Sequence, residues 1–247
     1  MNLNRKVAFQ SLVGSHNYNL NDETSDKDYK VFVYPTFDDL YNGKMYSHQS
    51  VGEFEDYDVH DLRKLPDLLR KANVNFLETL FSMDYKKGPA NRYLTVHLFA
   101  MRDELVTMNL PYLFNSTKGM HFQKRSSMLK TTEGTRHLVE KYGYDTKDFL
   151  HAYRVLDLFD RFYKTNFEDF EYALRYSDKE RVKMLEMKNG KYSYEEAVKM
   201  LDNKLAHHET YAEEMKKKEF NKEVFFKLET LVKEEVRRKL VRCMQYD

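Results

Sequence analysis

One stretch near the N-terminus decides the fold of this chain, and it reads Val13-Gly14-Ser15-His16-Asn17-Tyr18-Asn19-Leu20, then Ser25-Asp26-Lys27-Asp28-Tyr29-Lys30-Val31-Phe32-Val33-Tyr34. An apolar run that begins at Val7 ends at Gly14-Ser15, and a second apolar and aromatic run follows Asp28. This pattern predicts a strand, a tight turn, a short linker and a second strand.

The residue types in this stretch indicate a phosphate and metal site. Asp26 and Asp28 are two positions apart, so in a strand both carboxylates point to the same face. Two facing carboxylates repel unless a cation lies between them, and oxygen ligands favour Mg²⁺ or Mn²⁺. Gly14 lets the backbone approach a ligand, and Ser15 offers a hydroxyl and an N–H to phosphate oxygens. The alternative is a solvated turn, but the Gly-Ser pair at this spacing favours a site for a nucleoside triphosphate.

Gly14-Ser15 followed by Ser25-Asp26-Lys27-Asp28 resembles the signature of the DNA polymerase beta superfamily of nucleotidyltransferases. More narrowly, it resembles the predicted nucleotidyltransferases linked to RNA repair. Members of that group carry a second glycine after the Gly-Ser pair, where this chain has Asn19. The resemblance implies a nucleotidyltransferase-type mixed sheet, a divalent metal and a nucleoside triphosphate substrate.

A two-metal site needs a third carboxylate on a neighbouring strand, and residues 54–60 offer two candidates. The alternating pattern of this segment predicts a third strand, with Asp56, Asp58 and His60 on one face. The alternative is an edge strand whose charges prevent association. The resemblance implies Asp56 as the third metal ligand, and Asp58, which points the same way, stays open.

A second informative stretch begins at Tyr142 and includes Lys147, His151 and Arg154, which lie at i, i+4 and i+7 on one helical face. Such a stripe is either solvated charge or a surface for a triphosphate. The resemblance favours the triphosphate, because the same family has Gly-Tyr-Asp-x-Lys followed by a His and an Arg. In this chain it implies the residues Gly143, Tyr144, Asp145, Lys147, His151 and Arg154.

The rest of the chain gives coarser expectations. Residues 38–52 read as a loop, residues 61–81 as helix broken near residue 74, and residues 184–191 as a short strand or turn. Glu78 reads as an ordinary solvated helix carboxylate, with a capping or supporting role as the alternative. Ser193 and Glu196 have capping-box spacing, and residues 212–242 read as an amphipathic tail that packs on the body or on a second subunit.

Composition narrows the class of protein. The 247 residues are 41% hydrophobic and 15% aromatic, which favours a globular fold over disorder. The net charge of +1 gives no overall polycation for nucleic acid. Cys243 is the only cysteine, which excludes an intrachain disulfide. The sequence lacks a signal-peptide pattern and a membrane-spanning run, so we expect a soluble, cytoplasmic protein without a membrane partner.

Together these observations predict an α+β protein with a catalytic core over residues 1–90 and a mainly helical domain over residues 91–247. The expected function is metal-dependent transfer of a nucleoside monophosphate from a nucleoside triphosphate to a hydroxyl, with an RNA 3′ end as the favoured acceptor. Lys147, His151 and Arg154 would contact the triphosphate. The alternatives are a transferase that modifies a protein or small molecule and a non-catalytic nucleotide-binding or interaction protein. Oligomerisation through the C-terminal helices also stays open.

Overall fold

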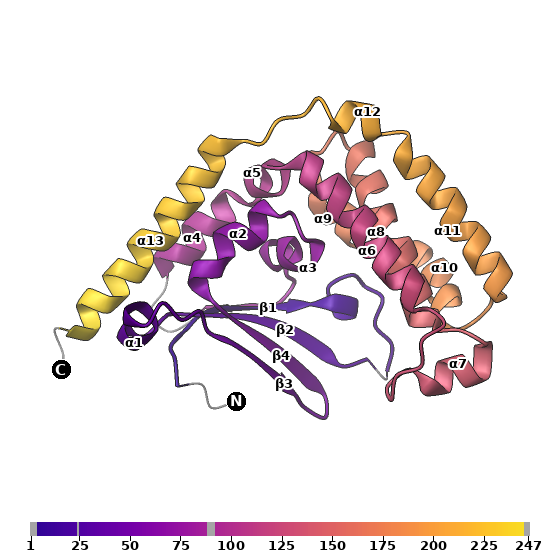
Figure 1. The fold of residues 1–247 in the computed structure, drawn as a ribbon, viewed down its shortest axis with the longest axis horizontal. Helices are drawn as coiled ribbons and strands as arrows, with labels where there is room; N and C mark the ends of the chain where they lie inside the picture. Colours follow the sequence, from indigo (N-terminus) through magenta and orange to yellow (C-terminus); the bar gives the residue numbers. More distant parts are fainter. Residues whose placement is uncertain (1–3, 24, 88–91, 245–247) are drawn as a thin grey trace. The chain divides into compact units, whose positions relative to one another are not determined.

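A computed structural model describes residues 4–23, 25–87 and 92–244 of the chain (Figure 1). It confirms the α+β class: strands lie in the first part of the chain, and helices make up most of the rest. Internal contacts divide the chain into two compact units. Unit 1 comprises Met1–Asn109 with Phe220–Asp247, and unit 2 comprises Leu110–Glu219. The predicted domain boundary, between residues 90 and 91, falls outside the described residues.

A five-stranded mixed sheet with the order β3-β4-β2-β1-β5 forms the centre of unit 1. β2 and β4 run parallel, and the other neighbouring strands pair antiparallel. The strands are β1 Val7–Val13, β2 Lys27–Val33, β3 Ser47–Val51, β4 Glu55–Asp61 and β5 Tyr85–Lys87.

Alternation along β2 gives the two faces of the sheet different chemistry. One face carries a buried apolar cluster of Leu12, Tyr29, Val31, Val33 and Val59. Asp28, Lys30 and Phe32 alternate with these residues, so they point to the opposite face. There Phe32 stacks on Phe9 at a ring-centroid distance of 4.8 Å. The second face therefore changes from aromatic to charged along the strand.

Short helices and turns complete unit 1, and α2 and α3 lie over one face of the sheet in Figure 1. The elements are the 3₁₀ turns Gly14–His16, Leu62–Lys64 and Glu78–Phe81, with α1 Phe37–Tyr41, α2 Leu65–Arg70, α3 Val74–Leu77, α4 Arg92–Ala100, α5 Arg102–Thr107 and α13 Lys222–Met244.

The C-terminal helix α13 packs on the body of unit 1, which is one of the two arrangements expected for the tail. It contacts α2 and α4, and its buried side chains include Val224, Leu228 and Val232. The hydroxyl of Tyr34, just after β2, also donates to the buried carboxylate of Glu235 at 3.1 Å. An apolar stripe and one buried polar contact thus join the end of the chain to the sheet unit.

Unit 2 is helical throughout its described residues, and α8 is its central helix. Helices α6, α9, α10 and α11 all pack on α8, whose buried residues include Phe149, Leu156 and Phe159. The helices are α6 Leu110–Ser127, α7 Arg136–Tyr142, α8 Thr146–Lys164, α9 Phe170–Leu174, α10 Asp178–Lys188, α11 Tyr194–Glu209 and α12 Ala212–Met215.

The structure corrects two local expectations. Residues 38–52 are not only a loop, since they contain most of α1 and the edge strand β3. β3 is polar and mostly exposed, so it shows no alternation that could reveal it. Residues 184–191 are not a strand, because α10 runs through Lys188 from a capping box at Ser177. The capping box that begins α11 at Ser193 is confirmed.

Candidate functional site

Gly14 occupies a position in the turn after β1 that only glycine fits without strain. Its φ of +73° lies in the left-handed region, which L side chains rarely adopt. A Cβ atom placed on Gly14 would also lie 2.5 Å from Oδ2 of Asp28. The turn backbone therefore lies directly against the Asp28 carboxylate.

Asn19 takes the conformation that a glycine would take in the same turn. Its φ is +62°, and asparagine tolerates this left-handed region better than most residues. The turn is closed by backbone hydrogen bonds, with the N–H of Leu20 donating to the Ser15 carbonyl at 2.8 Å. The departure from the family pattern at Asn19 therefore leaves the turn intact.

Asp28 and Asp56 are direct partners across the parallel strands β2 and β4. Residues in register on neighbouring strands project from the same face, so the two carboxylates share one side of the sheet. Burial raises the pKa of Asp28, and the charges of Asp56 and Asp26 raise it further, while Lys30 and His16 act against them. Asp26 itself is exposed at the entrance to β2. Asp28, which lies against the Gly14 turn, therefore has two acidic neighbours, Asp26 and Asp56.

Asp58 lies on the same face as Asp56, but its carboxylate is already paired with other side chains. Lys30 donates to its Oδ2, and Nε2 of His60 lies 3.0 Å from the same oxygen. Burial alone would raise the pKa of Asp58, yet the contacts with His60 and Lys30 hold it well below its usual range. Asp56 instead accepts the N–H of Gly52 at 3.2 Å. These contacts favour Asp56 over Asp58 as the third carboxylate.

The donor set fits a divalent cation in its chemistry. Asp28 and Asp56 supply carboxylate oxygens on one face of the sheet, and such oxygens are ligands that Mg²⁺ and Mn²⁺ favour. The ligand shell is not fully arranged, since the described residues contain no group of three or more His, Cys, Asp or Glu side chains positioned to hold a metal ion. A cation here would take its remaining ligands from substrate or solvent.

Glu78 is a buried part of this site, although the sequence favoured an ordinary solvated carboxylate. Its side chain is 2% exposed. The N–H of Gly14 donates to its Oε2 at 3.0 Å, and the hydroxyl of Tyr18 donates to its Oε1. Nδ2 of Asn17 lies 3.4 Å from Oε2. In the sequence, a capping or supporting role for Glu78 was only the alternative to an ordinary solvated carboxylate.

The bond to Glu78 changes which atoms of the turn can meet a phosphate. Because the Gly14 N–H is used internally, it is not the donor that the sequence had indicated. Ser15 is partly exposed, and across the described part of the chain neither its N–H nor its hydroxyl donates to another protein group. Ser15 is therefore the residue of the turn whose N–H and hydroxyl are available to a ligand.

In unit 2, the residues before α8 fix where that helix begins. Gly143 ends α7 with a φ of +81°, and the hydroxyl of buried Tyr144 donates to the Tyr192 carbonyl at 2.9 Å. Asp145 caps α8 by accepting the N–H groups of Lys147 and Asp148 at 2.9 and 3.0 Å. The motif residues that precede the stripe are thus structural.

The three residues of the predicted stripe on α8, Lys147, His151 and Arg154, differ in their exposure to solvent. Lys147 and His151 are exposed on α8. Arg154, one turn further along, is only 3% exposed. Of the three predicted phosphate contacts, only Lys147 and His151 are therefore on the surface.

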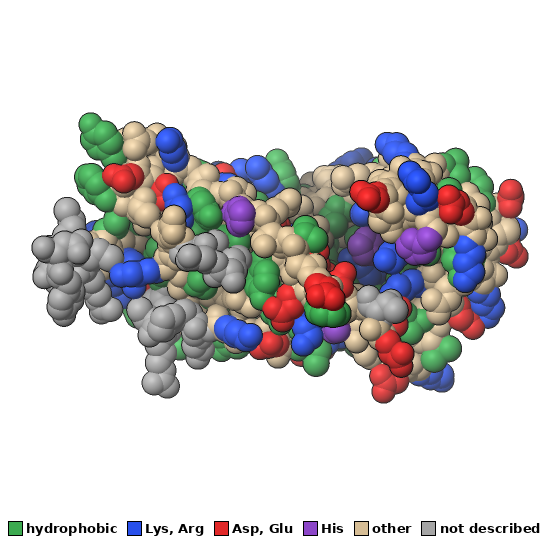
Figure 2. Space-filling model, turned by 90° about the horizontal axis from the view of Figure 1, so that it is seen from below, with side chains coloured by type: hydrophobic (Ala, Val, Ile, Leu, Met, Phe, Trp, Pro, Cys, Tyr) green, Lys and Arg blue, Asp and Glu red, His purple; other side chains and the backbone are tan. Residues whose placement is uncertain are grey.

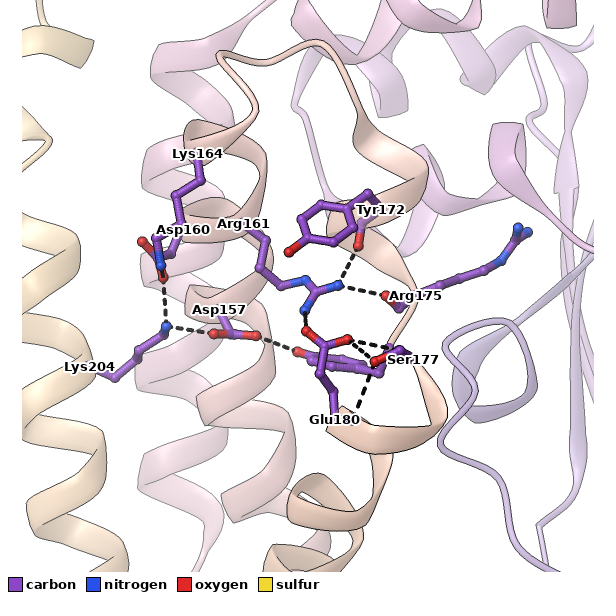
Figure 3. A network of polar contacts seen from close by, with 10 residues as sticks. Asp157, Asp160, Arg161, Lys164, Tyr172, Arg175, Ser177, Glu180 and Lys204 are labelled. Atoms are coloured by element: carbon purple, nitrogen blue, oxygen red, sulfur yellow. Dashed lines mark hydrogen bonds and ion pairs between the residues drawn. The ribbon is translucent and has the colours of Figure 1, made fainter.

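The sequence did not predict the network of polar contacts that α8 makes with its neighbouring helices (Figure 3). Nζ of Lys204 lies 2.6 Å from Asp157 and 3.1 Å from Asp160. Arg161 pairs with Glu180 and donates to the carbonyls of Tyr172 and Arg175 at 2.6 and 2.8 Å. These contacts join α8 to α9, α10 and α11, so they hold unit 2 together.

Acidic and basic side chains are interspersed on the face of the molecule shown in Figure 2, and the net charge of the whole chain is +1. None of the described helices is long and apolar enough to cross a membrane.

Comparison with known proteins identifies no relative: no protein-family model matches this chain, and no curated protein matches it.

Proposed function

We propose that the chain is a metal-dependent nucleotidyltransferase that moves a nucleoside monophosphate from a nucleoside triphosphate to a hydroxyl group. The observation that carries this proposal is the meeting of Gly14, Asp28 and Asp56. A left-handed glycine lies against one carboxylate, and a second carboxylate is in register with the first. Gly14 and Asp28 also belong to the two sequence segments that resemble those of nucleotidyltransferases.

Each candidate site residue in unit 1 has its own role in this proposal. Asp28 and Asp56 would hold two divalent cations, and exposed Asp26 would add a further oxygen ligand from the entrance to β2. Ser15 donates its N–H and hydroxyl to the β and γ phosphates. Of the two Mg²⁺ or Mn²⁺ ions, one would lower the pKa of the attacking hydroxyl and the other would neutralise charge on the leaving pyrophosphate.

Asp58 has a supporting task. Its charge is taken up by Lys30 and His60, so a cation would have to displace an existing ion pair to bind it. A cation that binds Asp56 would displace no such ion pair, because the Asp56 carboxylate accepts a hydrogen bond from the backbone N–H of Gly52. The third carboxylate is therefore assigned to Asp56.

Lys147 and His151 are the two side chains of the α8 stripe that we assign to triphosphate binding. Their support is exposure on one face of α8 and the resemblance of the motif around them. Arg154 lies on the same face of α8, but its side chain is buried.

The acceptor we favour is the 3′ hydroxyl of an RNA, on the strength of the resemblance. The near-neutral net charge of +1 favours a small contact with an RNA end over a long nucleic-acid footprint. A protein or small-molecule hydroxyl is the competing acceptor.

Incubation with each α-labelled nucleoside triphosphate, total RNA and Mg²⁺ tests the proposal. The expected result is label on RNA with the wild type and none with Asp28→Asn. Label on the protein or on a small molecule would keep the transfer and change the acceptor. Binding of triphosphate without transfer to any acceptor would replace catalysis by nucleotide binding alone.

A further inference from the structure

We infer that Glu78 is a positioning residue, which sets the Gly14–Ser15 turn in the conformation that presents Ser15 to a triphosphate. This inference rests on the proposed function and names a residue outside the glycine, serine and aspartate set. It starts from a buried carboxylate that lies 64 positions away from Gly14 in sequence.

The contacts of Glu78 converge on the turn. The backbone N–H of Gly14, the hydroxyl of Tyr18 and the side-chain amide of Asn17 all reach its carboxylate. Because a buried carboxylate costs several kcal/mol unless donors satisfy it, the donors and the carboxylate hold each other in place.

Asn17 extends the contact to the chain after Glu78. Its amide group is fully buried, and its Oδ1 accepts the N–H of Met83 at 3.1 Å. Nearby, the hydroxyl of Ser82 donates to the Leu12 carbonyl at 2.7 Å. The segment after α3 is thereby fastened to both the end of β1 and the turn.

This arrangement decides which turn atoms face outward. With the Gly14 N–H directed at Glu78, the backbone turns so that Gly14 touches Asp28 and the next residue, Ser15, is partly exposed. Without the carboxylate, the Gly14 N–H would lose its acceptor, and a glycine has a wide choice of other conformations. Triphosphate binding would then have to restore the turn at its own cost.

The test compares two matched pairs of variants in the full chain. Glu78→Gln and Tyr18→Phe weaken the contact at the turn. Glu235→Gln and Tyr34→Phe weaken a second buried Glu–Tyr contact in unit 1, away from the turn. Each protein is measured by amide hydrogen exchange without ligand and by titration with a non-hydrolysable triphosphate in Mg²⁺.

We expect Glu78→Gln to speed exchange of the Gly14 amide at least about tenfold and to weaken triphosphate binding about tenfold. The Glu235 and Tyr34 variants should change neither, even if their unfolding temperature falls. A Glu78→Gln protein with wild-type exchange at Gly14 would overturn the inference, as would faster exchange with unchanged affinity. If the wild type binds no triphosphate, the proposed function fails, and the exchange rates still decide whether Glu78 sets the turn.

Discussion

Asp28 and Asp56 face each other across the parallel strands β2 and β4, each the register partner of the other. Burial raises the pKa of Asp28, and the neighbouring charges of Asp56 and Asp26 raise it further, as expected when like charges lie close together. An arrangement that costs stability and places two oxygen donors on one face is typical of a functional site.

The first prediction separates function from stability at Asp28. Asp28→Asn keeps the side-chain size and removes one charge of the cluster. Transfer activity should fall roughly a thousandfold or more, since a metal clamp contributes several kcal/mol. Thermal unfolding in EDTA should occur at an equal or higher temperature, because repulsion with Asp56 is relieved. Near-normal turnover in Asp28→Asn would refute the metal-site assignment.

The second prediction distinguishes the two carboxylates of β4. Asp56→Asn should lose activity as Asp28→Asn does and keep its stability. Asp58→Asn should lower the free energy of unfolding by about 2 kcal/mol, since Lys30 and His60 lose their shared partner. Denaturant unfolding and turnover on the same samples measure both effects. The opposite pattern would move the metal ligand to Asp58.

The third prediction concerns Gly14. Gly14→Ala should cost about 1–2 kcal/mol for the left-handed backbone, plus the contact with Asp28 Oδ2. Gly43→Ala is the matched control, because Gly43 also has a positive φ (+61°) and an added Cβ would touch nothing within 4 Å. The two variants should share the backbone cost, and only Gly14→Ala should lose triphosphate affinity. Equal affinities in an isothermal titration would count against a close approach of ligand at this turn.

The fourth prediction tests the stripe on α8. Lys147→Ala should weaken triphosphate binding about tenfold with little change in stability, because its exposed ammonium would form a charge-assisted bond to phosphate. Lys141→Ala, which removes another exposed lysine of unit 2, should leave affinity unchanged. Arg154→Ala should lower the unfolding temperature, since a buried side chain is removed. Unchanged affinity in Lys147→Ala would leave the stripe as solvated charge.

The fifth prediction is a pH dependence of stability in unit 2. His208 is 1% exposed and stacks on Phe114 at 4.3 Å. Burial lowers its pKa to about 4, against a weaker upward effect of its hydrogen bond to the Phe114 carbonyl.

The direction of the pH effect follows from the pKa of His208 in the folded and in the unfolded chain. Because the folded pKa lies below the usual value of about 6.5, the unfolded chain binds the proton more readily. The contribution of neutral His208 is complete above about pH 6.5 and is lost as the pH falls toward 4. Between pH 7 and pH 5 the loss should be about 2 kcal/mol. Denaturant unfolding at both pH values should show it in the wild type and less of it in His208→Phe, and an equal loss in both would assign it to other groups.

Local features of this protein could be predicted from the sequence. The strand alternation around Asp28, the turn at Gly14, the capping box at Ser193 and the packing stripe of the C-terminal helix each depend on residues close together in the chain. Such patterns work because side-chain direction and capping are set within one or two turns or a few strand residues.

The tertiary structure decided what depends on partners far apart in the chain. The pairing of Asp58 with Lys30 and His60, on which we base the proposal of Asp56 as third carboxylate, follows from the register of β2 against β4, which alternation cannot specify. Burial of Glu78 needed the segment after α3 to fold back on the first turn. Sequence periodicity reports which face a residue occupies, whereas its partner, and hence its charge state and its task, is set only when distant segments pack together.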